Sequence, residues 1–266
     1  MKKLLAAALA FALGCSDCFA EAFSPDTGCT LTTSLTCYWD MDEASGTRVD
    51  SKNGEDLTDN NTVGSTTGKV ADAAQFVSVD SEFLSRADSA NLSLGADTSF
   101  TVACWVYIDT IQDSKIVDKE DAAVGTLATE YILGLNGDST WRARIANGIS
   151  STTIDSDTGT AINTATWYFL VMIHDASADT FTLRVNDSTE TQNSYSSGTQ
   201  DGVNRLLIGA RNVAGLDDQY FDGRIDEVGF WKKALTAQEV TDLYNAGTGN
   251  TYDPSGSCGG QVIIVS

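Results

Sequence analysis

The chain contains very little proline and histidine, with 2 prolines and 1 histidine among 266 residues. No low-complexity tract and no change of composition marks an interdomain linker. Beyond residue 20 there is no Cys-x-x-Cys pair, no His-Glu-x-x-His sequence and no glycine-rich phosphate loop that ends in lysine. These absences exclude the commonest zinc, redox and nucleotide-binding motifs.

Basic residues are also scarce, with 16 lysines and arginines against 37 aspartates and glutamates. The formal net charge is −21 and the isoelectric point is about 4.1. Such a surface repels phosphate backbones, so we expect no nucleic-acid partner. The excess of acid is explained either by solubility or by attraction of divalent cations, and the sequence leaves both open.

No apolar run is long enough to cross a bilayer. The longest one near the N-terminus, Leu4–Gly14, follows two lysines and is typical of a secretion signal. Cleavage after Ala20 or Ala22 would leave small residues at the required positions, and we predict that residues 1–20 are removed. Lipoprotein anchoring at Cys15 is the alternative. The prediction is therefore a secreted, extracellular or cell-surface protein without membrane insertion after signal removal.

Four cysteines lie beyond the predicted signal, and an even number in an exported chain favours disulfides. They are Cys29, Cys37, Cys104 and Cys258. Cys104 shares a strand face with apolar residues, which is typical of a small buried side chain. We expect one disulfide among the other three, with the pairing left open.

Short alternating apolar runs recur every 8 to 15 residues or so, separated by Gly, Asn, Asp and Ser. This pattern predicts antiparallel strands packed as a sandwich. We assign one domain to residues 21–253 and a Gly-rich tail to residues 254–266. The tail ends in the β-prone Val262–Val265, which would either lie on the sheet or pair with another chain.

The segment 220–231 has the alternation of a long strand. Strict alternation would place Asp226 with Val228 and Phe230 on one face, and Glu227 with Trp231 on the other. Thr236 and Glu239 have capping-box spacing, which predicts a helix from Ala237 to about Ala246 that ends at Gly247.

This closing strand and helix resemble the last segment of LamG-like (laminin G type 3) domains of the concanavalin A-like lectin/glucanase superfamily. Other stretches resemble further motifs of that family in the same order, namely Tyr38–Thr47, Asp50–Gly54, Gly68–Phe76, Ser99–Val106 and Leu206–Gly209. The resemblance implies an all-β fold, an antiparallel two-sheet jelly-roll sandwich with one short helix near the C-terminus.

The resemblance also implies a structural Ca²⁺ near the meeting of the first and last strands. Calcium requires several hard oxygen ligands. The implied ligands are Asp226, Asp50 and Asn53, with Asp42 a weaker candidate. The alternative for Asp226 is a solvated carboxylate paired with Arg224 or Arg184.

Catalysis is not expected. The glucanases of the same superfamily need carboxylates that alternate along one strand face, and neither Asp40–Glu43 nor Asp226–Glu227 has that pattern. The single histidine, His174, lies at the mouth of a hairpin loop, where we expect it to be solvated. No Gly-x-Ser-x-Gly elbow surrounds a serine.

Sugar binding is the favoured activity. Trp141 and Tyr131 are the predicted aromatic platform, and Arg142 and Arg144 are the predicted polar forks, all on a concave face. The alternative is that Trp141 belongs to the core and the arginines pair with aspartates.

The sequence thus predicts a non-catalytic extracellular carbohydrate-binding or adhesion module, stabilised by calcium, whose partner is a glycan or glycoprotein surface. The first alternative is a filament or coat subunit that self-assembles through its terminal strand. A divergent glycoside hydrolase or lyase is the second.

Overall fold

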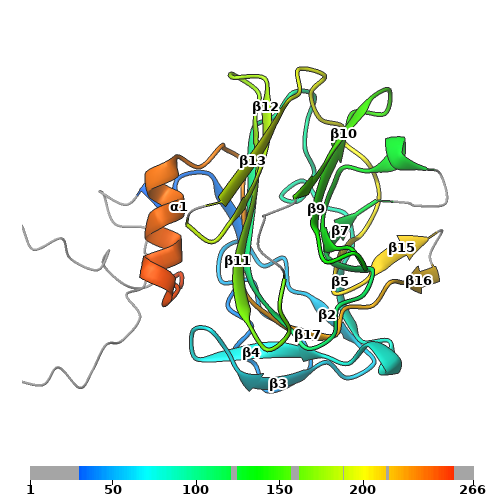
Figure 1. Cartoon of the computed structure of the whole chain (residues 1–266), viewed down its shortest axis with the longest axis vertical. Coiled ribbons are helices and arrows are strands. Elements are labelled where there is room, and N and C mark those ends of the chain that lie inside the picture. The colour runs from blue at the N-terminus through cyan, green and yellow to red at the C-terminus, as the bar shows by residue number, and fades with distance from the viewer. Residues whose placement is uncertain (1–29, 121–124, 157–161, 188, 214–215, 255–266) are drawn as a thin grey trace, which may run out of the picture.

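Two antiparallel sheets face each other across an apolar core (Figure 1). The computed structural model describes residues 30–120, 125–156, 162–187, 189–213 and 216–254. The expected all-β sandwich with one short helix is confirmed. The predicted signal, Cys29, Cys258 and Val262–Val265 lie outside the described residues.

One sheet, here the helix-side sheet, has the strand order β13-β12-β11-β6-β17-β4-β3, and β1 pairs with β17 beside it. Its strands are β1 (Leu35–Trp39), β3 (Gly64–Thr67), β4 (Asp72–Phe76), β6 (Phe100–Ile108), β11 (Trp167–Asp175), β12 (Thr180–Val185), β13 (Thr189–Ser194) and β17 (Gly223–Trp231). The edge strand β13 has the sequence TETQNS and carries no apolar residue.

The other sheet, here the hairpin-side sheet, has the order β10-β9-β8-β7-β14-β5-β2. Its strands are β2 (Thr58–Asn60), β5 (Phe83–Arg86), β7 (Ser114–Lys119), β8 (Tyr131–Leu135), β9 (Trp141–Ala146), β10 (Ser151–Ser156) and β14 (Leu206–Ile208). A separate hairpin, β15 (Arg211–Val213) with β16 (Leu216–Asp218), lies beside β7. Short 3-10 turns occupy Thr30–Thr32, Ser78–Asp80, Thr126–Ala128 and Asn245–Gly247.

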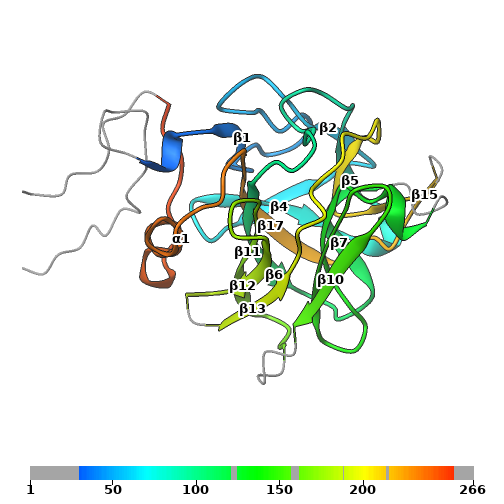
Figure 2. The ribbon, with the colours of Figure 1, turned by 90° about the horizontal axis from the view of Figure 1, so that it is seen from above.

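Two apolar cores follow from these layers. The first fills the space between the sheets and includes Trp39, Phe100 and Phe181. The second lies on the outer face of the helix-side sheet, where Trp105 and Trp231 pack against the C-terminal helix. Figure 2 shows the helix α1 (Ala237–Tyr244) on that outer face. Burial of each large apolar side chain contributes roughly 1.5–3 kcal/mol.

Helix α1 (Ala237–Tyr244) begins at the predicted residue, and the capping box of Thr236 and Glu239 is formed in both directions. It ends two residues earlier than expected. Asn245 adopts the left-handed conformation (φ 46°) and caps the helix, so Gly247 is not the stop.

A β-bulge interrupts β17 and corrects the predicted faces. The pairing with β6 shifts register between Asp226 and Gly229, and Glu227 has a positive φ of 51°. Asp226 and Glu227 therefore both lie on the outer face, while Val228 turns into the inter-sheet core. Strict alternation was wrong here because the bulge adds one residue.

One further expectation is corrected. His174 is not solvated but fully buried, with Nδ1 3.1 Å from the carbonyl oxygen of Thr98 and its ring beside Phe100 and Tyr195. The thiols of Cys37 and Cys104 are free and buried in the core. The burial of Cys104 was expected, and the disulfide stays a prediction because Cys29 and Cys258 lie outside the described residues. Within the described residues no helix is long and apolar enough to cross a membrane.

A buried ion pair lies at one end of the sandwich. Lys119 pairs with Glu130, and both side chains are fully buried. Asp88 contacts the same ammonium group at 2.8 Å. Burial nevertheless raises the pKa of Glu130 to about 7, because desolvation outweighs the attraction of Lys119.

This raised pKa predicts a pH dependence of stability. A carboxyl whose pKa is higher in the folded state stabilises the fold below its unfolded pKa of about 4.5, and that contribution is lost as the pH rises through about 7. Between pH 5 and pH 8 this carboxyl should cost the wild type up to about 3 kcal/mol in the free energy of unfolding, and Glu130→Gln should not show that decrease. Urea titrations at the two pH values measure it. Glu190 is exposed, so the control variant Glu190→Gln should keep the wild-type dependence of stability on pH. Parallel pH profiles for Glu130→Gln and the wild type would refute the assignment.

Candidate functional site

The bulge in β17 buries the carboxylate of Asp226 against the turn that precedes β4. Its Oδ2 accepts hydrogen bonds from the backbone N–H groups of Lys69 (2.7 Å) and Val70 (3.0 Å). The turn approaches so closely that a Cβ on Gly68 would lie 2.7 Å from Oδ2. Oδ1 is buried and has no hydrogen-bond partner among the described residues.

The electrostatics around Asp226 are unfavourable to negative charge. Burial raises the pKa of Asp226 well above its usual value, and the carboxylate of Asp42 adds to the increase. Burial, and then the charge of Asp226, raises the pKa of Glu227 as well, although the Tyr38 hydroxyl donates a hydrogen bond to Glu227. Two adjacent acidic groups thus share one desolvated face.

The expected alternative for Asp226, a solvated carboxylate paired with arginine, is wrong. Asp226 is fully buried. Arg224 lies over the ring of Tyr107, with its guanidinium carbon 4.3 Å from the ring centroid, and Arg184 pairs with Asp187 at 3.0 Å. A buried carboxylate oxygen without a partner is energetically costly, and a bound cation would offset that cost.

The donor set suits calcium in type. Asp226 and Asp42 offer the hard oxygens that Ca²⁺ prefers. Within the described residues, however, no group of three or more His, Cys, Asp or Glu side chains could hold a metal ion. A cation at Asp226 therefore needs backbone carbonyl oxygens in addition to these two carboxylates.

Asp50 and Asn53 are engaged elsewhere. Oδ1 of Asp50 accepts from the N–H groups of Tyr38 and Lys52, and Oδ2 from those of Asn53 and Glu55, at 2.8–3.0 Å. The Asn53 amide donates to the carbonyl oxygen of Thr36. Four N–H donors use the lone pairs of the Asp50 carboxylate, so it holds its own turn and is poorly placed to bind a cation.

The predicted sugar platform is not formed. Trp141 and Tyr131 are fully buried in the inter-sheet core, where Trp141 packs edge-on against Tyr168. Alternation along β9 sends Arg142 and Arg144 to the opposite, outer face. The two aromatic rings and the two arginines therefore cannot line one surface.

Arg142 and Arg144 remain accessible on the hairpin-side sheet, but with close partners. Arg142 forms a bidentate pair with Asp155 at 2.6 and 2.8 Å. Nε of Arg144 donates to the Thr153 hydroxyl at 3.1 Å, and its guanidinium lies 3.7 Å from Glu120. The expected alternative, pairing with aspartate, is confirmed for Arg142, whereas the acidic neighbour of Arg144 is the glutamate Glu120.

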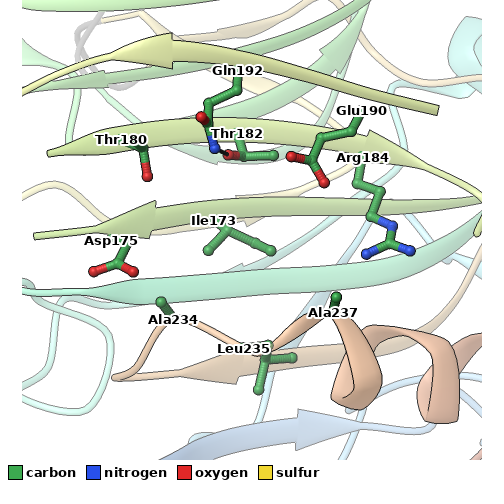
Figure 3. A pocket seen from close by; sticks show the side chains of 10 residues that line it. All are labelled: Ile173, Asp175, Thr180, Thr182, Arg184, Glu190, Gln192, Ala234, Leu235 and Ala237. Carbon is green, nitrogen blue, oxygen red and sulfur yellow. Dashed lines mark hydrogen bonds between the residues drawn. The ribbon is translucent and has the colours of Figure 1, made fainter. Parts of the chain in front are cut away.

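A pocket of about 220 Å³ lies on the outer face of the helix-side sheet, beside the start of α1. Figure 3 shows its polar side chains arranged over β11, β12 and β13, with the segment after β17 along one side. Its lining residues are Ile173, Asp175, Thr180, Thr182, Arg184, Glu190, Gln192, Ala234, Leu235 and Ala237.

The pocket combines an apolar patch with hydrogen-bonding groups of both kinds. Ile173 and Leu235 supply the patch, and Leu235 belongs to the core beneath α1. The Gln192 amide donates to the Thr182 hydroxyl at 3.0 Å. Arg184 is tied to Asp187, whose carboxylate also accepts from the hydroxyl of Thr241 on α1. The wall is therefore braced against the helix.

Residues 84–241 match the family model described as laminin G type 3, of the concanavalin A-like lectin/glucanases superfamily. This chain belongs to that family. No curated protein matches it as a relative.

The laminin G fold also appears in solved structures of low sequence identity. The binding domain of Paraclostridial Mosquitocidal Protein 1 has a TM-score of 0.65 at 15% identity, over 82% of this chain and 53% of that one. Botulinum neurotoxin serotype D binding domain in complex with N-acetylneuraminic acid has a TM-score of 0.59 at 12% identity, over 80% and 51%. Domain 4 of AbnA, an extracellular arabinanase from Geobacillus stearothermophilus, in complex with arabinotriose, has a TM-score of 0.57 at 19% identity. This match covers 79% of this chain and 97% of that one. The chain thus spans about half the length of the toxin domains.

The laminin G domain also contains a pair of carboxylates that sequence reasoning missed. Asp118 and Glu120 alternate on β7 and just beyond it, on the side covered by Asn212 of β15. Asp118 is fully buried and Glu120 is 2% exposed, and burial raises the pKa of Asp118. A pair sealed from solvent in this way is not placed to attack a polysaccharide.

The pocket residues were missed as well, although the sequence carries a signal for them. Thr180, Thr182 and Arg184 alternate on one face of β12, and Glu190 and Gln192 alternate on the neighbouring β13. Two paired strands with polar residues on one face indicate an exposed polar surface. The wall formed by residues 234–237 could not be located, since it comes from a distant part of the chain.

Proposed function

We propose that this laminin G domain is a non-catalytic carbohydrate-binding module that acts outside the cell. The observation that carries the proposal is the pocket beside α1, where an apolar patch lies among hydroxyl, amide, carboxylate and guanidinium groups. Sugars present both C–H faces and hydroxyl groups, so they suit a site with a few polar groups around an apolar floor.

The comparisons support the proposal at the level of the class of protein. Two of the similar structures contain a bound sugar, arabinotriose in one and N-acetylneuraminic acid in the other. The family name includes both lectins and glucanases. The buried state of Asp118 and Glu120 favours the lectin-like role over hydrolysis.

A glycan-array screen of the protein tests this function. We expect reproducible binding to one class of glycan, and about tenfold weaker binding for the double variant Thr180→Val, Gln192→Ala, which removes hydrogen-bonding groups worth roughly 0.5–1.5 kcal/mol each. Arg142→Ala, on the opposite sheet, should bind as the wild type does. A blank array would exclude the function. Loss of binding in Arg142→Ala alone would move the site to the hairpin-side sheet.

We also propose that a structural Ca²⁺ binds at Asp226. Asp226 and Asp42 would hold it together with backbone oxygens, and the ion would supply the positive charge that these desolvated carboxylates lack. The unpartnered Oδ1 of Asp226 supports the assignment. The ion's role here is to stabilise the fold, since the pocket lies over different strands.

Thermal denaturation with and without calcium checks this assignment. Saturating Ca²⁺ at about 100 times its Kd should stabilise the wild type by roughly 2.7 kcal/mol, or about 5–10 °C in Tm. Asp226→Asn should lose this response.

Asp50→Asn is the matched control. It should melt at a lower temperature, because the carboxylate that holds four N–H groups is lost, yet keep the full calcium response. If Asp226→Asn responds to calcium as the wild type does, the ion does not bind there.

A further inference from the structure

The residues that line the pocket beside α1 follow the strands for part of their length. Its polar residues on β12 run from Thr180 to Arg184, a distance of about 13 Å at the usual rise of 3.3 Å per residue. The lining residues on the neighbouring strands β11 and β13 lie on either side of this row (Figure 3). These rows of polar residues and the pocket that they line are here called the groove.

The charges that line the groove are mainly negative. Asp175 lies at one end and Glu190 towards the other, and Arg184 is the one basic residue among the lining side chains that the structure describes. Asp175 Oδ1 accepts from the N–H and hydroxyl groups of Ser177, an arrangement that favours its ionised form and lowers its pKa. Glu190 is exposed and points over the groove (Figure 3).

The positive charges near the groove are already neutralised. Nη2 of Arg184 donates to both the carbonyl and the carboxylate oxygen of Asp187 at 3.0 Å. Lys233, which precedes the lining segment, pairs with Glu239 at 2.5 Å and donates to the carbonyl oxygen of Thr30.

The start of α1 offers no substitute for these cations. A helix N-terminus attracts anions through its free N–H groups. Here Glu239 of the capping box already places a carboxylate in the first turn, and the Thr236 hydroxyl accepts from the Glu239 N–H. An acidic ligand would thus meet two carboxylates and no uncompensated cation among the described residues.

We infer that the groove selects neutral glycans and discriminates against sialylated or uronic-acid-containing ones, an inference that rests on the proposed carbohydrate-binding function. Carboxylates accept hydrogen bonds from sugar hydroxyls, so Asp175 and Glu190 bind a neutral chain while they repel an acidic one. N-acetylneuraminic acid, the ligand of the toxin structure, is then a poor ligand for this site.

The test compares matched glycans on one array. A galactose-terminated oligosaccharide and the same oligosaccharide capped with N-acetylneuraminic acid form one pair, and neutral and uronic-acid-substituted xylan form another. Within any pair of which the wild type binds a member, we expect at least about tenfold preference for the neutral member at low salt. The preference should fall as salt screens the repulsion.

Two charge-removing variants locate the effect. Glu190→Gln combined with Asp175→Asn should reduce the discrimination to within about twofold, measured as the ratio of the Kd values of the acidic and neutral members of a pair, so that a loss of affinity common to both members cancels. Asp201→Asn removes one negative charge from an exposed loop elsewhere and should retain the full preference.

Each other result overturns the inference. Equal or tighter binding of the acidic member does so while the carbohydrate-binding function stands. Unchanged discrimination in Glu190→Gln with Asp175→Asn shows that the groove is not its source. A blank array for all neutral and acidic glycans removes the proposed function and the inference together.

Discussion

Strand β17 must satisfy two apolar cores at once, and most of the molecule depends on how it does so. It pairs with β6, β4 and β1, and it sends Phe230 into the inter-sheet core and Trp231 beneath α1. A bulge at Asp226 and Glu227 sets which residue reaches which core. The strand also leads directly into the segment that forms one wall of the pocket, so packing and binding surface share one element.

The sequence was sufficient for what depends on local pattern. Alternating runs predicted the sandwich, and the spacing of Thr236 and Glu239 predicted the start of α1. The sequence was insufficient where one extra residue shifts the pairing register of a strand. No alternation rule anticipates the positive φ of Glu227, and the predicted faces of β17 were wrong from that point on.

The candidate site residues also divide into those that local pattern could place and those that it could not. Trp141 was expected at a surface because tryptophan is common in sugar-binding sites, whereas the strand's alternation alone already separates it from Arg142. The charge of Asp42 acts on Asp226, whereas the carboxylate of Asp50, an expected ligand beside Asp226, holds its own turn. The pocket joins β11–β13 to residues 234–237, and only the tertiary fold brings these segments together.

The polar composition of β13 restricts which substitutions the groove beside α1 can accept. An edge strand with free backbone groups invites addition of a foreign strand, and charged or polar side chains discourage it. Glu190 and Gln192 lie on that edge and also line the groove. Replacing them with larger apolar residues to tighten ligand contact would therefore create an aggregation-prone edge, so solubility restricts the ligands this surface can evolve to hold.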